Sequence, residues 1–336
     1  MTLRKDSLAE NDSRIISRKV YALRALAIVC VVAAHCEGYT FGVAETLRAL
    51  LGTIGVPVFL ICSGYYFNDH EKASVFWKKK TKGIVVPWLV WGCLTYLIIV
   101  VLGGKPLSVV EGIRWISGYK TWLYYVPVIL MCFLLFRICS KPWWYMINIL
   151  LFICSIAFSY LGFLKTTDYF TLYQIVFNYS GFFVLGILIR KRKLLLYMDN
   201  NQWIKVIISL CFVIIGIVYG VYGKEIGYWN SILSVPFELL SFFVLYFIAC
   251  AFKDNDIIVQ VGKKSFFIYF VHMEIGIGLA KHLIFRWFPS SLGVFDSIFV
   301  FVKPIVIVAI SFALCIGLGK LFELIKLRKY GWLLSI

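Results

Sequence analysis

The chain has 336 residues, of which 61% are apolar and 18% aromatic, whereas only 15% are charged. A typical soluble domain has about 25% charged residues, so this composition excludes an ordinary soluble globular protein and predicts a protein that crosses a membrane many times. The net charge of +17 would suit nucleic-acid binding, but the distribution of the basic residues along the chain excludes that class.

Ten apolar runs follow one another along the chain, and each is close to the roughly 20 residues that a helix needs to cross a bilayer. Gly, Pro, Asn and charged residues lie between the runs, as is typical of connections. The sequence therefore predicts an all-α fold, a polytopic transmembrane helical bundle of about ten spans whose longest polar connection is residues 68–83. The predicted spans are residues 20–37, 50–68, 84–102, 122–138, 146–163, 172–189, 205–222, 231–251, 265–285 and 298–319.

Lys and Arg gather in alternate connections. With the N-terminus in the cytoplasm, 24 of the 34 Lys and Arg residues lie on the cytoplasmic side, nine lie outside, and Arg24 lies within a span. This positive-inside pattern accounts for most of the charge without a nucleic acid, and it predicts that both termini are cytoplasmic. The expected parts are a cytoplasmic tail over residues 1–19, a membrane domain over 20–325 and a cytoplasmic tail over 326–336.

The first span carries two groups that are costly in hydrocarbon, Arg24 and His35. A charge in the middle of a membrane helix costs about 2.5–3.5 kcal/mol on insertion scales. Eleven residues at 100° each bring the two side chains within about 20° of one helix face, with a rise of roughly 16 Å between them. The pair predicts one polar slot through the membrane, although snorkelling of Arg24 and a hydrogen bond from His35 to another helix are the structural alternative.

The end of the second span and the start of the third carry further candidates. Ser63 and Gly64 allow a backbone or a ligand to approach closely, and helix packing explains them equally well. Lys79 and Lys82 belong to a basic cluster where the third span leaves the cytoplasm. Such a cluster either enforces topology and attracts anionic lipid or binds the phosphates of a soluble molecule.

Polar groups recur in the eighth and ninth spans. Glu238 follows Pro236 in the eighth span, where a structural partner and a functional role are equally plausible for a carboxyl group. In the ninth, Ser265, Tyr269 and His272 share one helix face. Capping by Ser265 and interfacial packing of Tyr269 are the structural alternative, whereas His272 lies two turns inside the span.

The ten cysteines lie singly, mostly within apolar runs. The sequence contains no C-x-x-C pair and no Cys/His spacing that is typical of a metal site. We therefore expect small apolar packing residues and no metal.

Several of these stretches, in this order and spacing, resemble the acyltransferase-3 family of integral membrane acyltransferases. The resemblance runs along most of the chain, and two positions depart from the family pattern: Lys79 and Lys82 replace an R-x-x-R pair, and Thr121 replaces a frequent histidine. The matching elements are Arg24 with His35; Phe59, Ser63, Gly64 and Tyr65; the basic pair; T-W-L-Y-Y-V-P from Thr121, which contains Trp122; and Gly262, Lys263, Ser265, Ile268, Tyr269 and His272.

The resemblance implies an enzyme of the bacterial cytoplasmic membrane that moves an acyl group, commonly acetyl, from cytoplasmic acyl-CoA to a hydroxyl of a cell-surface polysaccharide or its lipid-linked precursor. Acyl-CoA is then a co-substrate, with no bound cofactor, and the partners are the glycan acceptor and membrane lipids. The chain lacks the soluble esterase-like domain of some relatives, so the membrane domain is expected to transfer the acyl group alone.

The resemblance and the spacing together suggest roles for the candidate residues. Arg24 and His35 are expected to be catalytic, with His35 as general base. The expected donor-binding residues are Lys79, Lys82, Ser265, Tyr269 and His272, and the possible supporting residues are Ser63, Gly64, Trp122 and Glu238.

Two other classes of function stay open from the sequence. A transporter of a small solute would use the same Arg, His and Glu side chains as a path through the membrane, although no repeat supports it. A scaffold in a polysaccharide assembly complex has no positive signal.

Overall fold

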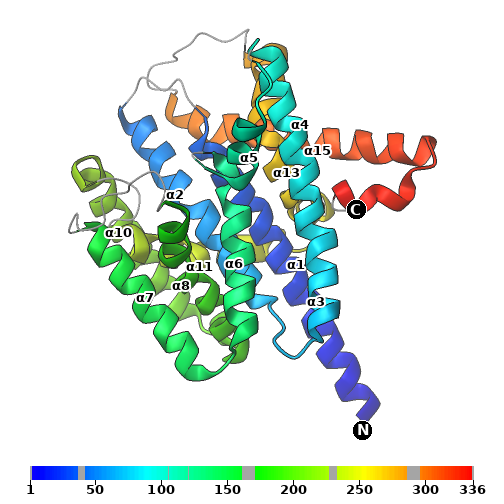
Figure 1. Ribbon diagram of the computed structural model, residues 1–336. Helices are drawn as coiled ribbons and strands as arrows, with labels where there is room; N and C mark the ends of the chain where they lie inside the picture. The colour runs from blue at the N-terminus through cyan, green and yellow to red at the C-terminus, as the bar shows by residue number, and fades with distance from the viewer. Residues whose placement is uncertain are drawn as a thin grey trace.

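The computed structural model describes residues 2–36, 42–104, 106–119, 121–160, 171–226, 233–285 and 296–334. Within these ranges the regular structure is helical, and the long helices pack into one bundle (Figure 1). The predicted all-α class is confirmed. The helices are α1 (Thr2–Ala34), α2 (Gly42–Tyr65), α3 (Ala73–Lys80), α4 (Val86–Leu102), α5 (Val109–Ser117), α6 (Tyr125–Ile138), α7 (Pro142–Tyr160), α8 (Thr171–Lys191), α9 (Leu194–Asp199), α10 (Gln202–Ile226), α11 (Ser234–Phe252), α12 (Asp256–Lys263), α13 (Ser265–Val271), α14 (Gly278–Leu283) and α15 (Asp296–Leu324).

Each of the ten predicted spans overlaps a helix, and residues 37, 161–163 and 231–232 of those spans lie outside the described ranges. Five helices in the described part of the chain are long and apolar enough to cross a membrane, and the bent pair Val109–Ser117 and Trp122–Ile138 makes a sixth if it is one span. The protein is therefore a helical membrane bundle. The number of ten spans and the cytoplasmic position of both termini stay predictions.

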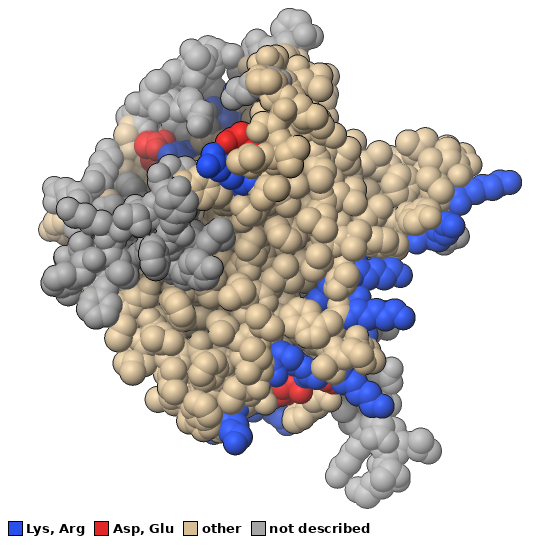
Figure 2. Space-filling view, in the orientation of Figure 1, with Lys and Arg blue, Asp and Glu red and all other residues tan. Residues whose placement is uncertain are grey.

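Charged side chains are unevenly distributed over the face drawn in Figure 2. Most of the visible Lys and Arg atoms gather along its lower and right-hand edge, around α3 and around the C-terminal end of α15, and a broad band beyond them carries few charges. A membrane protein needs such an apolar band to face lipid, because hydrocarbon offers charged groups neither water nor counter-ions.

The centre of the bundle is formed by α1 and α2. In the most apolar window of α2, 72% of the residues are buried inside the protein, whereas in α10 only 6% are. α1 packs against α2, α11, α12, α13 and α15, and α2 also contacts α8, α10 and α11. Arg24, in the apolar half of α1, and His35, directly after its last residue, are partly buried and therefore lie among other helices.

The basic segment before the third span is helical, so the predicted connection over residues 68–83 is wrong from Ala73 onward. α3, a π-helical turn over Thr81–Val85, and α4 form one continuous stretch, residues 73–102. Lysine is a good helix former, so the cluster continues the helix. Pro87 has no N–H to donate, and the chain accommodates it with the π turn, in which Val86 N–H bonds to Thr81 O.

Helical segments extend into both of the predicted terminal tails. α1 begins at Thr2, and its N-terminal end projects from the bundle in Figure 1. At the other end, Arg328–Leu334 forms a short 3-10 segment that contacts α4 and α15. Trp91 Nε1 donates to Leu333 O over 3.0 Å, and Leu334 is fully buried. The last two residues lie outside the described ranges.

The backbones of α2 and α8 are in close contact at two glycines, Gly64 of α2 and Gly186 of α8. A Cβ atom at Gly64 would lie 2.0 Å from Phe183 O, and a Cβ at Gly186 would lie 2.0 Å from Ile61 O. Both distances are far below van der Waals contact, and both obstacles are backbone atoms that cannot turn aside. This is the close approach that small residues allow between membrane helices, so packing alone accounts for Gly64.

We expect Gly64→Ala to lower the thermal unfolding midpoint in detergent, because overpacking costs about 1–3 kcal/mol and the clash is with backbone. The matched control is Gly317→Ala in α15, where an added Cβ meets nothing within 4 Å. Alanine favours a helix over glycine by about 1 kcal/mol. Because Gly317→Ala introduces no clash, we expect it to leave the midpoint unchanged or to raise it. Equal midpoints for the two variants would contradict the packing argument.

Candidate active site

A basic cavity of about 400 Å³ lies beside the N-terminal half of the apolar part of α1. Three cations from three helices line it: Arg24 of α1, Lys80 of α3 and Lys263 of α12. Among the described residues, no carboxylate lies within salt-bridge distance of any of the three. Like charges around one cavity repel one another, so an anion bound there would be stabilised by all three.

Aromatic rings surround these cations. The guanidinium of Arg24 lies 5.9 Å from the ring centroids of both Tyr21 and Phe59. The ammonium of Lys80 lies 4.2 Å from the centroid of Phe133. Such cation–π contacts stabilise a charge at the rim of an apolar region without neutralising it. The ring contacts therefore hold these two cations at the cavity without pairing them to a carboxylate.

The two lysines predicted from the sequence lie differently. Lys79 forms an ion pair with Glu71 and is 67% exposed at its side chain, outside the lining of the basic cavity. Lys82 lies 5.8 Å from the ring centroid of Trp332, which does line the cavity. Neighbouring residues on a helix point about 100° apart, and here Lys80 faces inward. Sequence reasoning missed Lys80, Lys263 and Trp332 as cavity residues, although the first two stand in the elements that it singled out.

A second cavity, of about 250 Å³, lies at the other end of α1. It contains His35 and the predicted residues Trp122 and Tyr269. Behind His35 lies His272, which is fully buried, with 5.3 Å between the two imidazole centroids. The lining residues are Val31, Ala34, His35, Gly52, Val56, Trp122, Tyr124 and Tyr269.

The walls of this histidine cavity are held by hydrogen bonds and ring contacts. The Tyr269 hydroxyl donates to the backbone oxygen of Trp122, and the indole ring of Trp122 lies 5.2 Å from the imidazole of His272, edge to face. Arg48 Nη1 donates to Ala34 O over 2.7 Å, which satisfies a carbonyl at the end of α1 and places a cation at the helix C-terminus. Sequence reasoning missed Arg48, because its hydrogen bond to Ala34 O forms only when α1 packs on α2.

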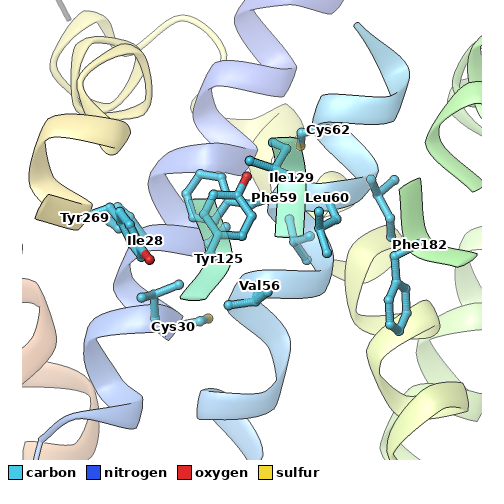
Figure 3. Packing of buried hydrophobic residues seen from close by; sticks show 14 of the residues in the cluster. Ile28, Cys30, Val56, Phe59, Leu60, Cys62, Tyr125, Ile129, Phe182 and Tyr269 are labelled. Carbon is cyan, nitrogen blue, oxygen red and sulfur yellow. The ribbon is translucent and has the colours of Figure 1, made fainter. Parts of the chain in front are cut away.

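The prediction of one continuous polar slot is wrong. The two cavities share no lining residue, and aromatic side chains fill the space between them. The ring centroids of Tyr125 and Tyr269 are 5.5 Å apart, and those of Phe59 and Tyr125 are 6.1 Å apart (Figure 3). We call these three residues the aromatic partition. They come from α2, α6 and α13. The helical period of α1 places Arg24 and His35 on one face, but it does not show which side chains of other helices pack between them.

The remaining candidates lie at or near these cavities. Ser63 lines the basic cavity, and its hydroxyl donates to Phe59 O over 2.8 Å. Ser265 and Glu238 are buried, on α13 and α11, but line neither cavity. The structure thus brings Arg24 and Ser63 to one cavity and His35, Trp122 and Tyr269 to the other, with His272 packed against His35.

Comparison with known proteins identifies the family of this chain. A family model described as an acyltransferase domain matches residues 19–321, which include both cavities except Trp332. No curated protein and no solved structure matches the chain. The match covers nearly the whole chain and agrees with the helical membrane bundle. The chain belongs to the acyltransferase-3 family and is a membrane acyltransferase.

Proposed function

We propose that this protein is an O-acyltransferase of the bacterial cytoplasmic membrane. It moves an acetyl group from cytoplasmic acetyl-CoA to a hydroxyl of a cell-surface polysaccharide or of its lipid-linked precursor. The observation that carries the proposal is the pair of cavities along α1, one lined by three cations without carboxylate partners among the described residues and one containing His35. A polyanionic donor and an alcohol that must lose a proton require these two environments.

The donor occupies the basic cavity first. Arg24, Lys80 and Lys263 neutralise its phosphate groups, and the planar guanidinium of Arg24 is suited to bidentate contact with phosphate oxygens. The pantetheine arm then runs along α1 toward His35, a rise of roughly 16 Å over eleven helical residues. Because the aromatic partition lies on this route, its rings must rotate aside when the arm enters.

The chemical step takes place beside His35. One ring nitrogen of His35 accepts the proton of the acceptor hydroxyl while the hydroxyl oxygen attacks the thioester carbonyl carbon. The new C–O bond forms, the C–S bond breaks, and the departing thiolate takes the proton from the His35 imidazolium. The transfer thus needs no oxidant and no other reactant.

Purified protein in liposomes, supplied with radiolabelled acetyl-CoA and a polysaccharide acceptor, tests the proposal. We expect label to move to the acceptor only when the protein is present. Uptake of a solute without label transfer would instead show a transporter and overturn the proposal. NMR of the surface polysaccharide of the host should show an O-acetyl signal when the protein is present, and this signal should be lost when the protein is absent.

The two adjacent lysines make a matched pair for donor binding. Lys80→Gln should raise the KM for acetyl-CoA about 10- to 100-fold, because a hydrogen bond to a charged group contributes about 1.5–3 kcal/mol. Lys79→Gln should change it less than threefold, since Lys79 lies outside the cavity and is paired with Glu71. Initial rates at varied acetyl-CoA measure both, and the opposite order would contradict this assignment of the cavity.

A further inference from the structure

We propose that His272 is a positioning residue that orients His35 through an imidazole–imidazole hydrogen bond. This inference rests on the proposed function, because it concerns the same proton transfer. In the active arrangement, one ring nitrogen of His35 faces the cavity and the acceptor hydroxyl, and the other carries a proton and donates it to Nε2 of His272. The structure supports this assignment in three ways.

The first is the proton on His272 itself. Its Nδ1 lies 2.7 Å from the backbone oxygen of Tyr269. A carbonyl oxygen can only accept, so Nδ1 is the donor and carries the proton. A neutral imidazole protonated at Nδ1 has a lone pair at Nε2. The backbone of α13 therefore determines that Nε2 is an acceptor.

The second is the absence of another partner for that acceptor. Nε2 of His272 is buried and makes no hydrogen bond within the part of the chain that the structure describes. Burying an unpaired acceptor costs about 1–3 kcal/mol, and the large majority of buried polar side-chain atoms in native proteins have a hydrogen-bond partner, so this one requires an explanation. The residue also opens the π-helical turn His272–Ile277, and π turns within α-helices are frequent at functional sites.

The third is the distance to His35. Two imidazoles joined by an N–H···N bond of about 3 Å have their centroids about 5 Å apart, and the centroids of His35 and His272 are 5.3 Å apart. The rings are tilted by 44°, and a tilt of this kind is compatible with the bond, because an N–H···N bond requires only that the N–H points at the acceptor lone pair. Catalytic hydrogen bonds are commonly poorly aligned before the substrate binds and tighten in the reactive complex.

The pairing gives His35 what a general base requires. His35 is the first residue after the end of α1, and among the described residues no backbone group forms a hydrogen bond with its ring that would determine its tautomer. Donation to His272 leaves the lone pair of His35 directed at the cavity. When His35 accepts the hydroxyl proton, the bond to His272 holds the imidazolium until the thiolate takes the proton. A partner of this kind typically changes activity 10- to 100-fold, as measured for the partners of metal-bound histidines.

His272→Phe and His272→Gln test the proposal with the full-length protein in liposomes. Phenylalanine keeps a flat ring against Trp122 but has no acceptor, whereas the glutamine amide oxygen can accept from His35. We expect His272→Phe to lower kcat about 10- to 100-fold with the KM for acetyl-CoA within twofold of wild type. His272→Gln should recover most of kcat. If His272→Phe does not fold, His272→Asn, whose amide is too short to reach His35, takes its place.

The outcomes separate this inference from the proposed function. A raised KM with unchanged kcat would assign His272 to donor binding and overturn the inference, and so would equal losses in the Phe and Gln variants. If His35→Ala abolishes transfer while His272→Phe behaves like wild type, the proposed function stands and the inference fails. If wild-type protein transfers no label at all, the proposed function itself fails.

Discussion

Replacing His35 by alanine is expected to lower kcat for acyl transfer by about 10²- to 10⁴-fold, the contribution of a well-placed general base. His35 is the imidazole that lines the histidine cavity, and no other histidine among the lining residues can replace it. The KM for acetyl-CoA should change little, because the cations that bind the donor lie in the other cavity. Rates of label transfer in liposomes, at saturating acetyl-CoA, measure the effect.

His282→Ala is the matched control for His35→Ala. His282 is exposed on α14 and lines neither cavity, so this variant should transfer label at the wild-type rate. Thermal unfolding midpoints of both variants should stay near that of wild type, since His35 is only partly buried. Undiminished transfer by a folded His35→Ala protein would remove His35 from the chemistry.

The second large effect is expected at Arg24. Arg24→Ala should lower kcat/KM for acetyl-CoA about 30-fold or more, because removing one partner of a buried charge pair costs about 2–5 kcal/mol and each 1.4 kcal/mol is tenfold. The loss should appear mainly in KM, as Arg24 binds the donor in the ground state and in the transition state. Arg24→Lys should recover part of it, since lysine keeps the charge but loses the bidentate geometry.

Lys78→Gln is the control for Arg24→Ala, because it also removes one positive charge, from an exposed position on α3 outside the cavity lining. It should leave KM within about twofold of wild type, as expected for an exposed charge. If both variants raised KM equally, general attraction of an anion to the basic surface would explain the effect, and Arg24 would have no specific role in binding the donor.

Local pattern predicted the helices well because membrane spans are long, apolar and bounded by charged residues. All ten predicted spans overlap helices. The errors come from the connections. The basic segment beginning at Ala73 contains lysines that are polar and yet good helix formers, so polarity alone wrongly predicted a loop. Arg328–Leu334 contacts α4 and α15 far away in the chain, and no local pattern signals such a contact.

For the candidate site, residue type and spacing were most informative about α1. The eleven-residue interval correctly indicated that Arg24 and His35 both face the protein interior, because the period of the helix is constant. The sequence singled out Lys79, whereas in the structure Lys80 lines the basic cavity and Lys79 is paired with Glu71. The two lysines differ by one helical step, and only the packing of α3 on α6, where Phe76 and Lys80 both contact the ring of Phe133, determines which of them points inward.

The sequence by itself determined that this is a helical membrane protein whose first span carries Arg24 and His35 on one face, and it indicated the acyltransferase-3 family. Composition, span length and helical period are properties of a single segment, and each depends only on local chemistry. Tertiary structure alone decided that the polar face of α1 borders two cavities, that Phe59, Tyr125 and Tyr269 separate them, and that His272 lies beside His35. These are contacts between helices, and a helix's own period determines which side chains share a face but not what packs against it.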